Sequence, residues 1–266
     1  MQVVLITGGS TGIGKATGEL LKSKNFTVIG TSRSPDRYSN HPFPLIQMDL
    51  HDATSIQKAV ETVVTKYGAI DVLVNNAGKG IAGPIEETPL DEIRSVFETN
   101  LVGATAVIQS VIPTMRTKNE GKIINITSIA GYSGLPFRAA YSATKSALHM
   151  LTESLRLELK PTNIQCCTLA PGDVATNISQ GRYHVPVKKN SPYHAIYGAA
   201  RKDMDAHVDD GVSAKTVAIS INRLIQKNKL KPHYTVGPFL QRFSIYLKSY
   251  LPAKIYEFIL SKFYKI

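Results

Sequence analysis

The sequence predicts an α/β fold in which a doubly wound parallel sheet of about seven strands is flanked by helices, within a single domain over residues 1–266. Short apolar, β-branched runs alternate with stretches of helical periodicity, which is the pattern of a parallel sheet with helical crossovers. The first apolar run passes directly into a glycine-rich turn. A length of 266 residues suits one such domain with one substantial core.

The expected elements follow from this alternation. Helices are expected between the strands, for example at residues 15–24, 53–66 and 141–159. Parallel strands place their carboxyl ends at one edge of the sheet, and ligands bind beyond that edge. We therefore expect the functional residues in the loops that follow the strands. The expected strands are residues 2–7, 27–31, 45–48, 71–74, 122–127, 163–169 and 233–236.

The first strand ends in a glycine-rich turn, Gly8-Gly9-Ser10-Thr11-Gly12-Ile13-Gly14, and a helix follows. Glycines let a backbone turn tightly and approach a pyrophosphate, and the helix N-terminus offers N–H donors and partial positive charge. The spacing is G-x-x-x-G-x-G rather than the commoner G-x-G-x-x-G. Taken alone, it also fits a loop that binds no ligand.

Ser128, Tyr141 and Lys145 stand 13 and 4 residues apart. The first step joins the end of a strand to the start of a helix, and the second puts the phenol and the ammonium on one helix face. A tyrosine phenol has an ordinary pKa near ~10, and a neighbouring ammonium lowers this pKa by stabilising the phenolate. The tyrosine then exchanges a proton with a carbonyl oxygen that the serine hydroxyl holds. This chemistry requires a hydride donor, which the glycine-rich turn is suited to bind.

Six motifs together make the chain resemble the short-chain dehydrogenase/reductase family over about residues 1–177. The stretch 75–171 is most similar to the branch that contains hydroxysteroid dehydrogenases, retinol dehydrogenases and acyl-dihydroxyacetone-phosphate reductases. The resemblance implies a Rossmann-type fold, a nicotinamide cofactor, and interconversion of a carbonyl and an alcohol. The motifs are Thr7-Gly8-x-x-x-Gly12-x-Gly14, Asn75-Asn76-Ala77-Gly78, Asn100, Ser128, Tyr141-x-x-x-Lys145 and Pro171-Gly172-x-Val174-x-Thr176.

The resemblance also implies roles by position. Asn100 joins Ser128, Tyr141 and Lys145 as a catalytic residue, holding water in a proton relay through the lysine. Lys145 also bonds the nicotinamide ribose, and Tyr141 contacts the cofactor. Asn75 is expected to stabilise the sheet. The other implied cofactor contacts are Gly8, Ser10, Thr11, Gly12, Ile13 and Gly14 at the pyrophosphate, Asp49 and Leu50 at the adenine, Asn76, Ala77 and Gly78 at the adenosine ribose, and Pro171, Gly172, Val174 and Thr176 at the nicotinamide.

The end of the second strand bears on the choice of cofactor. An acidic residue there would bond the ribose 2′-OH of NAD and repel a 2′-phosphate. Position 32 is instead a serine, and Arg33 follows as a planar cation suited to a phosphate. The predicted cofactor is therefore NADP(H). Two points weigh against it: Thr11 stands where many NADP-linked family members carry Lys or Arg, and Arg33 is also interpretable as a solvated surface residue.

Cysteine and histidine usage gives no sign of a metal. Cys166 and Cys167 are adjacent in an apolar strand, which favours neither a disulfide framework nor a metal site. The seven histidines lack metal-ligand spacing. We therefore expect no metal and a reduced, cytoplasmic setting.

Residues 177–212 are expected to form a long irregular insertion, which in the family is a lid over the substrate pocket. Aromatic side chains recur in it, and Leu135, Pro136 and Phe137 add to them just before Tyr141. This composition predicts a small hydrophobic carbonyl or alcohol as the substrate. The insertion includes Tyr183, His184, Pro186, Pro192, Tyr193, His194 and Tyr197.

Positive charge is concentrated toward the C-terminus. Residues 1–180 carry 16 Lys/Arg against 15 Asp/Glu, whereas residues 181–266 carry 15 against 5. Within 238–266, apolar residues recur at helical spacing between lysines, which predicts two basic amphipathic helices. Such helices suit peripheral contact with an anionic membrane. Alternatively, their apolar faces cover the substrate pocket or a dimer partner. Nucleic-acid binding is not expected, because no recognised module accompanies the charge.

The sequence thus predicts an NADPH-dependent carbonyl reductase that acts on a hydrophobic, lipid-like ketone with Tyr141 as proton donor. One alternative is an NADP(H)-linked alcohol dehydrogenase that oxidises a steroid- or retinol-like alcohol. Another is a non-catalytic cofactor-binding protein, which is disfavoured because such relatives typically lose the Ser, Tyr or Lys. By resemblance, a homodimer or homotetramer is expected.

Overall fold

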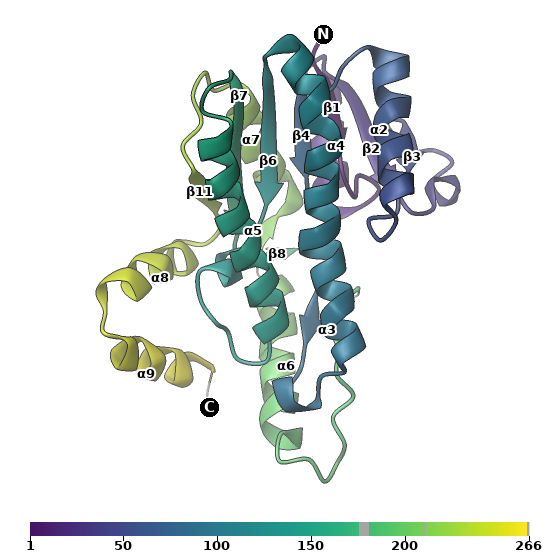
Figure 1. The fold of residues 1–266 in the computed structure, drawn as a ribbon. Coiled ribbons are helices and arrows are strands. Elements are labelled where there is room, and N and C mark those ends of the chain that lie inside the picture. Colours follow the sequence, from purple (N-terminus) through teal and green to yellow (C-terminus); the bar gives the residue numbers. More distant parts are fainter. Residues whose placement is uncertain (176–180, 210, 265) are drawn as a thin grey trace.

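A seven-stranded parallel sheet forms the centre of the computed structural model (Figure 1), which describes residues 1–175, 181–209, 211–264 and 266. Every neighbouring pair in this sheet is parallel. The predicted fold class is therefore confirmed. In spatial order the strands are β11 (His233–Val236), β7 (Ile164–Pro171), β6 (Gly121–Ile126), β4 (Val72–Asn75), β1 (Val3–Ile6), β2 (Thr27–Ser32) and β3 (Leu45–Gln47).

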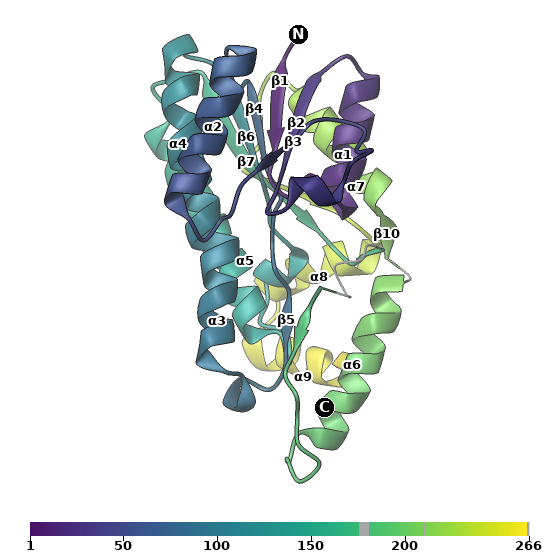
Figure 2. The same ribbon diagram turned by 90° about the vertical axis from the view of Figure 1, so that its right-hand side faces the viewer.

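Helices cover both faces of this sheet, as Figure 2 shows edge-on. Side chains of a strand alternate between the two faces, so β1 contributes Val3 and Leu5 to one core cluster and Val4 and Ile6 to the other. One face is covered by α1 (Gly12–Ser23) and α7 (Ala214–Ile225), and the other by α2 (Ala53–Tyr67), α4 (Gly103–Lys118) and α5 (Ala139–Glu158).

A continuous helical stretch, Leu90–Lys118, runs through α3 (Leu90–Phe97), the π-helical segment Glu98–Val102 and α4. By length and composition alone, these 29 residues are sufficient to cross a membrane, with a mean hydropathy of 1.2 over an 18-residue window. However, α4 packs against α2, β4 and β6, and its buried side chains belong to the core of the domain. We therefore interpret this stretch as a core helix.

The described part of the segment 177–212, residues 181–209 and 211–212, contains regular structure that the sequence analysis did not predict. Its described part contains β9 (Tyr183–His184), which pairs with β5 (Ile81–Ala82), and α6 (His194–Asp209). The expectation of an irregular insertion is therefore wrong for α6. Tyr197, Ala200 and Met204 form a buried stripe at helical spacing, packed on Phe137, and the sequence analysis overlooked that spacing.

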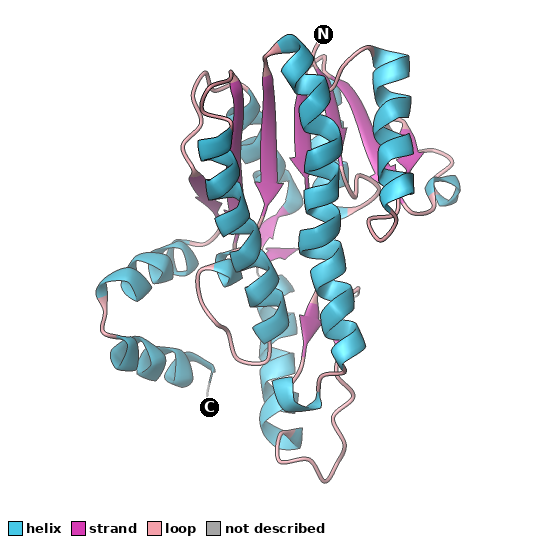
Figure 3. Cartoon of the chain, in the orientation of Figure 1, coloured by secondary structure: helices cyan, strands magenta, loops and turns pink. Residues whose placement is uncertain are grey.

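Two short helices end the chain, α8 (Phe239–Tyr250) and α9 (Ala253–Tyr264). Pro252 lies between them, where a helix cannot continue easily. Figure 3 shows that both helices project from the side of the domain, away from the stacked layers of helix and strand.

Candidate active site

The glycine-rich turn between β1 and α1 has the backbone that only glycine adopts readily. Gly8 and Gly12 have positive φ values of 64° and 54°, in the left-handed region. A Cβ on Gly14 would overlap the carbonyl oxygen of Gly8, so α1 begins directly against the turn. In the described structure, the Thr11 side chain makes no capping bond to α1. The first N–H groups of α1 therefore keep their capacity to bind a phosphate, and this cradle fits the pyrophosphate of a dinucleotide.

The end of β4 locks this turn in place. The Asn76 side-chain amide donates to the carbonyl oxygens of Thr7 and Gly8, at 2.9 and 3.2 Å. Thr7 Oγ1 in turn accepts from the N–H groups of Asn76 and Ala77. Asn75 is buried and donates to the carbonyl oxygen of Ala104 at the start of α4, which is a structural contact. The predicted ribose loop therefore lies beside the glycine-rich turn.

Ser128, Tyr141 and Lys145 lie where β6 ends and α5 begins. Ser128 opens the short helical turn Ile129–Gly131, and its Oγ accepts from the N–H of Ala130 at 3.1 Å. That turn packs directly on α5, since a Cβ on Gly131 would lie 2.9 Å from the Lys145 carbonyl carbon. Tyr141 is in the first turn of α5, and Lys145 Nζ lies 5.9 Å from the centre of its ring.

The ammonium of Lys145 is buried, with the residue only 4% exposed. Its Nζ donates to the carbonyl oxygen of Ile126 at 3.0 Å. Burial lowers the pKa of Lys145, and the nearby Tyr141 phenol opposes that shift because an anion there would favour the charged ammonium. The amine of Lys145 is therefore held beside the phenol of Tyr141, one turn further along α5.

Asn100 lies in the π-helical segment, beside Lys145. Its Oδ1 accepts from the N–H of Lys79 at 2.7 Å, and its Nδ2 donates to the carbonyl oxygen of Lys79 and to Thr144 Oγ1. A Cβ on Gly78 would lie 3.3 Å from Asn100 Oδ1 and 3.4 Å from Lys145 Nζ. The side chain thus joins α5 to the loop after β4. Single-turn π-helices are often found at functional sites.

The loop after β7 completes this side of the site. Gly172 donates its N–H to the carbonyl oxygen of Val236, and a Cβ on Gly172 would lie 3.2 Å from Ile129 Cδ1. The predicted nicotinamide loop therefore lies against the Ser128 segment. Pro171 ends β7, and Val174 begins the short strand β8 (Val174–Ala175). Thr176 lies outside the described residues.

The remaining predicted residues lie toward the other end of the same sheet edge, away from Tyr141. Arg33 follows β2 and is exposed, and the strand end beside it is tied to the glycine-rich turn by a bond from Gly9 N–H to the Thr31 carbonyl oxygen. Asp49 Oδ1 accepts from the N–H of His51, which shapes the loop after β3. Leu50 is buried against the start of α4, where a Cβ on Gly103 would overlap its carbonyl oxygen.

The sequence analysis missed Arg138, which occupies the position just before α5 and, in the part of the chain that the structure describes, makes no side-chain capping bond to it. Its guanidinium carbon lies 4.9 Å from the centre of the Tyr141 ring, a cation–π distance. Among the described residues, its buried Nε has no hydrogen-bond partner. The sequence did contain an indication of this contact, because an arginine three residues before Tyr141 would lie on the same helix face. The basic side chains of Arg138 and Lys145 therefore both lie near the Tyr141 ring.

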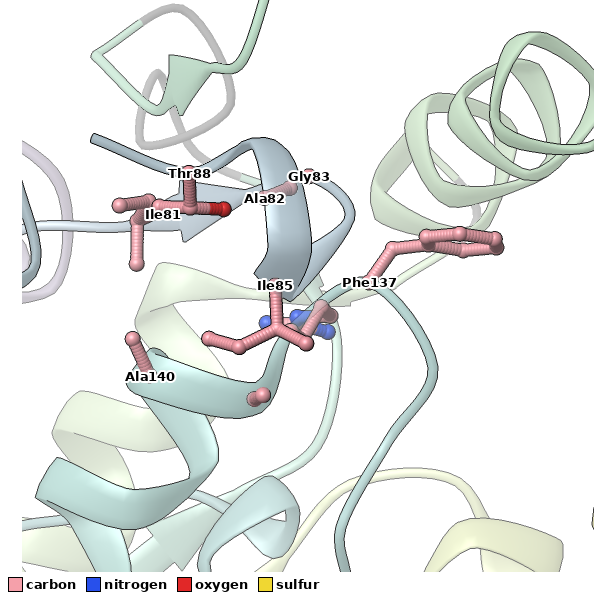
Figure 4. Close-up of a pocket in the computed structure, with 9 residues that line it drawn as sticks. Ile81, Ala82, Gly83, Ile85, Thr88, Phe137 and Ala140 are labelled. Carbon is pink, nitrogen blue, oxygen red and sulfur yellow. The ribbon is translucent and has the colours of Figure 1, made fainter. Parts of the chain in front are cut away.

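A small pocket lies beside the N-terminal end of α5, between the strand β5 and the segment 137–140 (Figure 4). Its volume of about 10 Å³ holds roughly one water molecule, so it is not a substrate cavity. Phe137 points away from Ile81 in Figure 4, and its ring lies 5.3 Å from that of Tyr197 on α6. Phe137 has a positive φ of 59°, which is strained for an aromatic residue.

A buried histidine lies behind the catalytic residues, one turn of α5 beyond Lys145. His149 Nδ1 is 3.2 Å from Thr168 Oγ1, and the same hydroxyl is 2.8 Å from His233 Nδ1. Burial, reinforced by the charges of His233 and Lys145, lowers the pKa of His149 to about 4. His149 is therefore neutral at neutral pH. The sequence analysis missed this pair because 84 residues separate the two histidines.

Known proteins resemble this chain along its whole length. Residues 2–185 match the short chain dehydrogenase family. A 3-ketodihydrosphingosine reductase of Bacteroides thetaiotaomicron is 33% identical over 266 residues, covering 100% of this chain and 98% of that protein. A short-chain dehydrogenase from Streptomyces avermitilis is similar in structure, with a TM-score of 0.82, 30% identity and 93% of each chain covered. A Burkholderia phymatum short chain dehydrogenase/reductase, solved in complex with NAD, has a TM-score of 0.76 at 25% identity over 88% of each chain.

The fold and the site together define an oxidoreductase with a nicotinamide-dinucleotide-binding domain. With the family match over more than half of its length, the chain belongs to the short-chain dehydrogenase/reductase family.

We predict that Gly14→Ala weakens binding of the nicotinamide dinucleotide by at least about tenfold, which is ~1.4 kcal/mol. The added Cβ would meet the Gly8 carbonyl oxygen and force the pyrophosphate cradle open. Gly198→Ala on α6 is the matched control, because a Cβ there meets open space. Titration calorimetry with NADP and with NADPH measures the dissociation constants. Equal constants for both variants would show that the turn does not hold the cofactor.

We predict that stability depends on pH through His149. Its folded-state pKa of about 4 is below its ordinary value of 6.5, so the unfolded chain binds the extra proton first and stability falls as pH drops through that window. The contribution lost is about 3 kcal/mol when pH falls from ~7 to ~4. Urea unfolding of the wild type and His149→Asn measures it. The stability advantage of the wild type should shrink in acid; a constant difference at every pH contradicts the assignment.

Proposed function

We propose that this protein is an NADPH-dependent reductase that transfers a hydride to the ketone carbon of a long-chain, lipid-like substrate. The observation that carries this proposal is the buried ammonium of Lys145 beside Tyr141, on the same edge of the sheet as the glycine-rich turn. This arrangement supplies a proton donor and a cofactor cradle on one edge of the sheet.

When bound, NADPH supplies the hydride. The Tyr141 hydroxyl donates a proton to the oxygen of the ketone as that oxygen gains charge, and the Ser128 hydroxyl donates a hydrogen bond to the same oxygen. Lys145 stabilises the phenolate left on Tyr141, because its ammonium is held close by the Ile126 carbonyl. Asn100 positions the loop next to Lys145. Lys145 passes a proton back to Tyr141 and takes up another from water near Asn100.

Two observations support a lipid-like substrate. The relative from Bacteroides thetaiotaomicron, which matches over the whole chain, is named a 3-ketodihydrosphingosine reductase. An apolar cluster of Ala82, Phe137, Tyr197 and Met204 also lies close to the segment that carries Tyr141. Residues 177–212 are proposed to act as the lid over this substrate.

The preference for NADPH over NADH is supported by charge at the end of β2. Arg33 is exposed there, and Arg37 follows in the short helical turn Pro35–Arg37. An acidic side chain, which would bond the ribose of NAD, is absent from positions 32–35.

The proposed setting is a reduced cytoplasm, consistent with the two buried free cysteines, Cys166 and Cys167. The proposed assembly is a homodimer or homotetramer. Met150 and Leu157 support it, because both apolar side chains are exposed on the outer face of α5. Light scattering on the purified protein measures the number of subunits.

Tyr141→Phe is expected to lower kcat on a long-chain ketone by about 10²- to 10⁴-fold, because it removes the proton donor. NADPH binding should change little, since the aromatic ring remains. Tyr67→Phe, which removes a hydroxyl on α2 away from this edge of the sheet, serves as the control. Near-normal turnover of Tyr141→Phe would rule out the mechanism.

The substrate is tested with ketones and alcohols of graded chain length, assayed with NADPH and NADP in both directions. We expect kcat/KM for reduction to rise with chain length. A higher kcat/KM for oxidation of a steroid or retinol-like alcohol would favour the alternative activity.

Arg33→Ala is expected to reduce the preference for NADPH over NADH, measured as the ratio of kcat/KM values, by about tenfold, since it removes a charged partner of the 2′-phosphate. Arg116→Ala is the matched control, because it removes an exposed arginine in the last turn of α4. An unchanged ratio in Arg33→Ala means that this arginine is only a solvated surface residue.

A further inference from the structure

Helix α8 presents an apolar stripe to solvent. Phe239, Phe243, Tyr246 and Tyr250 recur at spacings of four, three and four residues, so they lie along one face. They are 72%, 43%, 63% and 84% exposed, and the Phe239 and Phe243 rings stack at 5.8 Å. Large aromatic side chains gathered this way on a surface mark an interaction site.

Helix α9 continues this surface. Its exposed apolar residues are Ile255, Phe258, Ile259 and Phe263. Lys254 and Lys262 border the stripe, and Lys262 Nζ lies 5.6 Å from the centre of the Phe258 ring. We call these two stripes together the apolar platform.

The opposite sides of both helices hold them to the domain. Gln241 bonds both the N–H and the carboxylate of Asp173, at 2.9 and 2.6 Å. Lys248 Nζ donates to the Tyr132 carbonyl oxygen, and the buried Tyr256 hydroxyl lies 2.8 Å from Ser133 Oγ. These side chains attach to the loops that follow Gly172 and Ser128, which are loops of the active site.

The apolar platform therefore faces away from its own domain. Only one large side chain of α9, Tyr256, is buried, and no residue of α8 within the described chain is buried. The alternative in which these apolar faces cover the substrate pocket does not hold for the exposed stripes. Figure 1 shows α8 and α9 standing out together on one side of the sheet.

We propose that the apolar platform docks on the surface of an anionic lipid bilayer. Basic side chains accompany the apolar ones on both helices: Arg242 on α8, and Lys254 and Lys262 on α9. Only one acidic residue, Glu257, lies on the described parts of these helices. Exposed aromatics with flanking cations are the features of a helix that lies in a membrane interface.

The positive charge around the apolar platform favours a bilayer over a second copy of the chain as its binding partner. Residues 181–266 carry 15 basic against 5 acidic residues. A symmetric dimer through this platform would bring two regions of like charge together, which is unfavourable, whereas anionic headgroups offset the same charge. The docking surface adjoins the active-site loops, so a substrate leaving the bilayer would have a short path to Tyr141. Docking itself does not depend on the proposed substrate.

Co-sedimentation of the full-length protein with vesicles tests the proposal. We expect the protein to sediment with vesicles that contain phosphatidylglycerol, much less with pure phosphatidylcholine, and less at high salt. Two variants should each lower the partition coefficient on anionic vesicles by at least about tenfold: Phe243→Ser with Phe258→Ser, which removes apolar area, and Lys254→Glu with Lys262→Glu, which reverses charge.

Lys227→Glu with Lys229→Glu is the matched control, because it makes the same change in net charge on the exposed loop before β11. It should lower vesicle binding much less than the platform variants. All variants should keep wild-type turnover of a short, water-soluble ketone, which separates this test from the proposed function. Absence of binding to anionic vesicles, or equal loss in the control, overturns the proposal. The proposal is also overturned if the wild type binds no vesicles and the Phe243→Ser/Phe258→Ser variant turns a dimer into a monomer. That result would identify a second copy of the chain as the occupant of the platform.

Discussion

The active site depends on one amine, that of Lys145, being held inside the protein. A buried lysine loses its hydration, and it stays charged only if nearby groups replace the lost water. Lys145 finds this replacement in the Ile126 carbonyl oxygen at the end of β6 and in the neighbouring Tyr141. The hydrogen bond from Lys145 Nζ to Ile126 therefore joins the end of β6 to α5.

The rest of the site is assembled around this point by the parallel sheet. β1, β4, β6 and β7 end at one edge, and their following loops carry the glycine-rich turn, the Asn76–Gly78 segment, Ser128 and Gly172. The loops then bind one another: Asn76 holds the glycine-rich turn, and Asn100 holds the backbone at Lys79 to Thr144 of α5. The C-terminal helices attach to two of these loops, through Asp173 and Ser133. A surface that binds a bilayer would thus be coupled mechanically to the active site.

The strands of the sheet could be predicted from the sequence because each is a short apolar run bounded by turns. All seven expected strands are present in the sheet. The spacing of Tyr141 and Lys145 predicted a shared helix face, and the two side chains do meet on α5. Helix α6 was missed because its apolar stripe of Tyr197, Ala200 and Met204 is sparse and lies among turn-forming residues. Contacts set by tertiary packing could not be predicted from the sequence. One example is the pair His149 and His233, which both contact the Thr168 hydroxyl. Helical periodicity indicated α8 and α9, but which of their faces is exposed follows only from how Gln241 and Tyr256 attach them.

The central claim is that the buried ammonium of Lys145 makes Tyr141 an effective proton-transfer group. It is tested most directly by kcat/KM for reduction of a long-chain ketone with NADPH, in the wild type and in Lys145→Met. The account predicts that the variant loses at least about 10²-fold in kcat/KM, because the phenolate left on Tyr141 has lost the group that stabilises it. Titration calorimetry on the same variant reports any loss of cofactor affinity separately. Equal kcat/KM in both proteins would contradict the account.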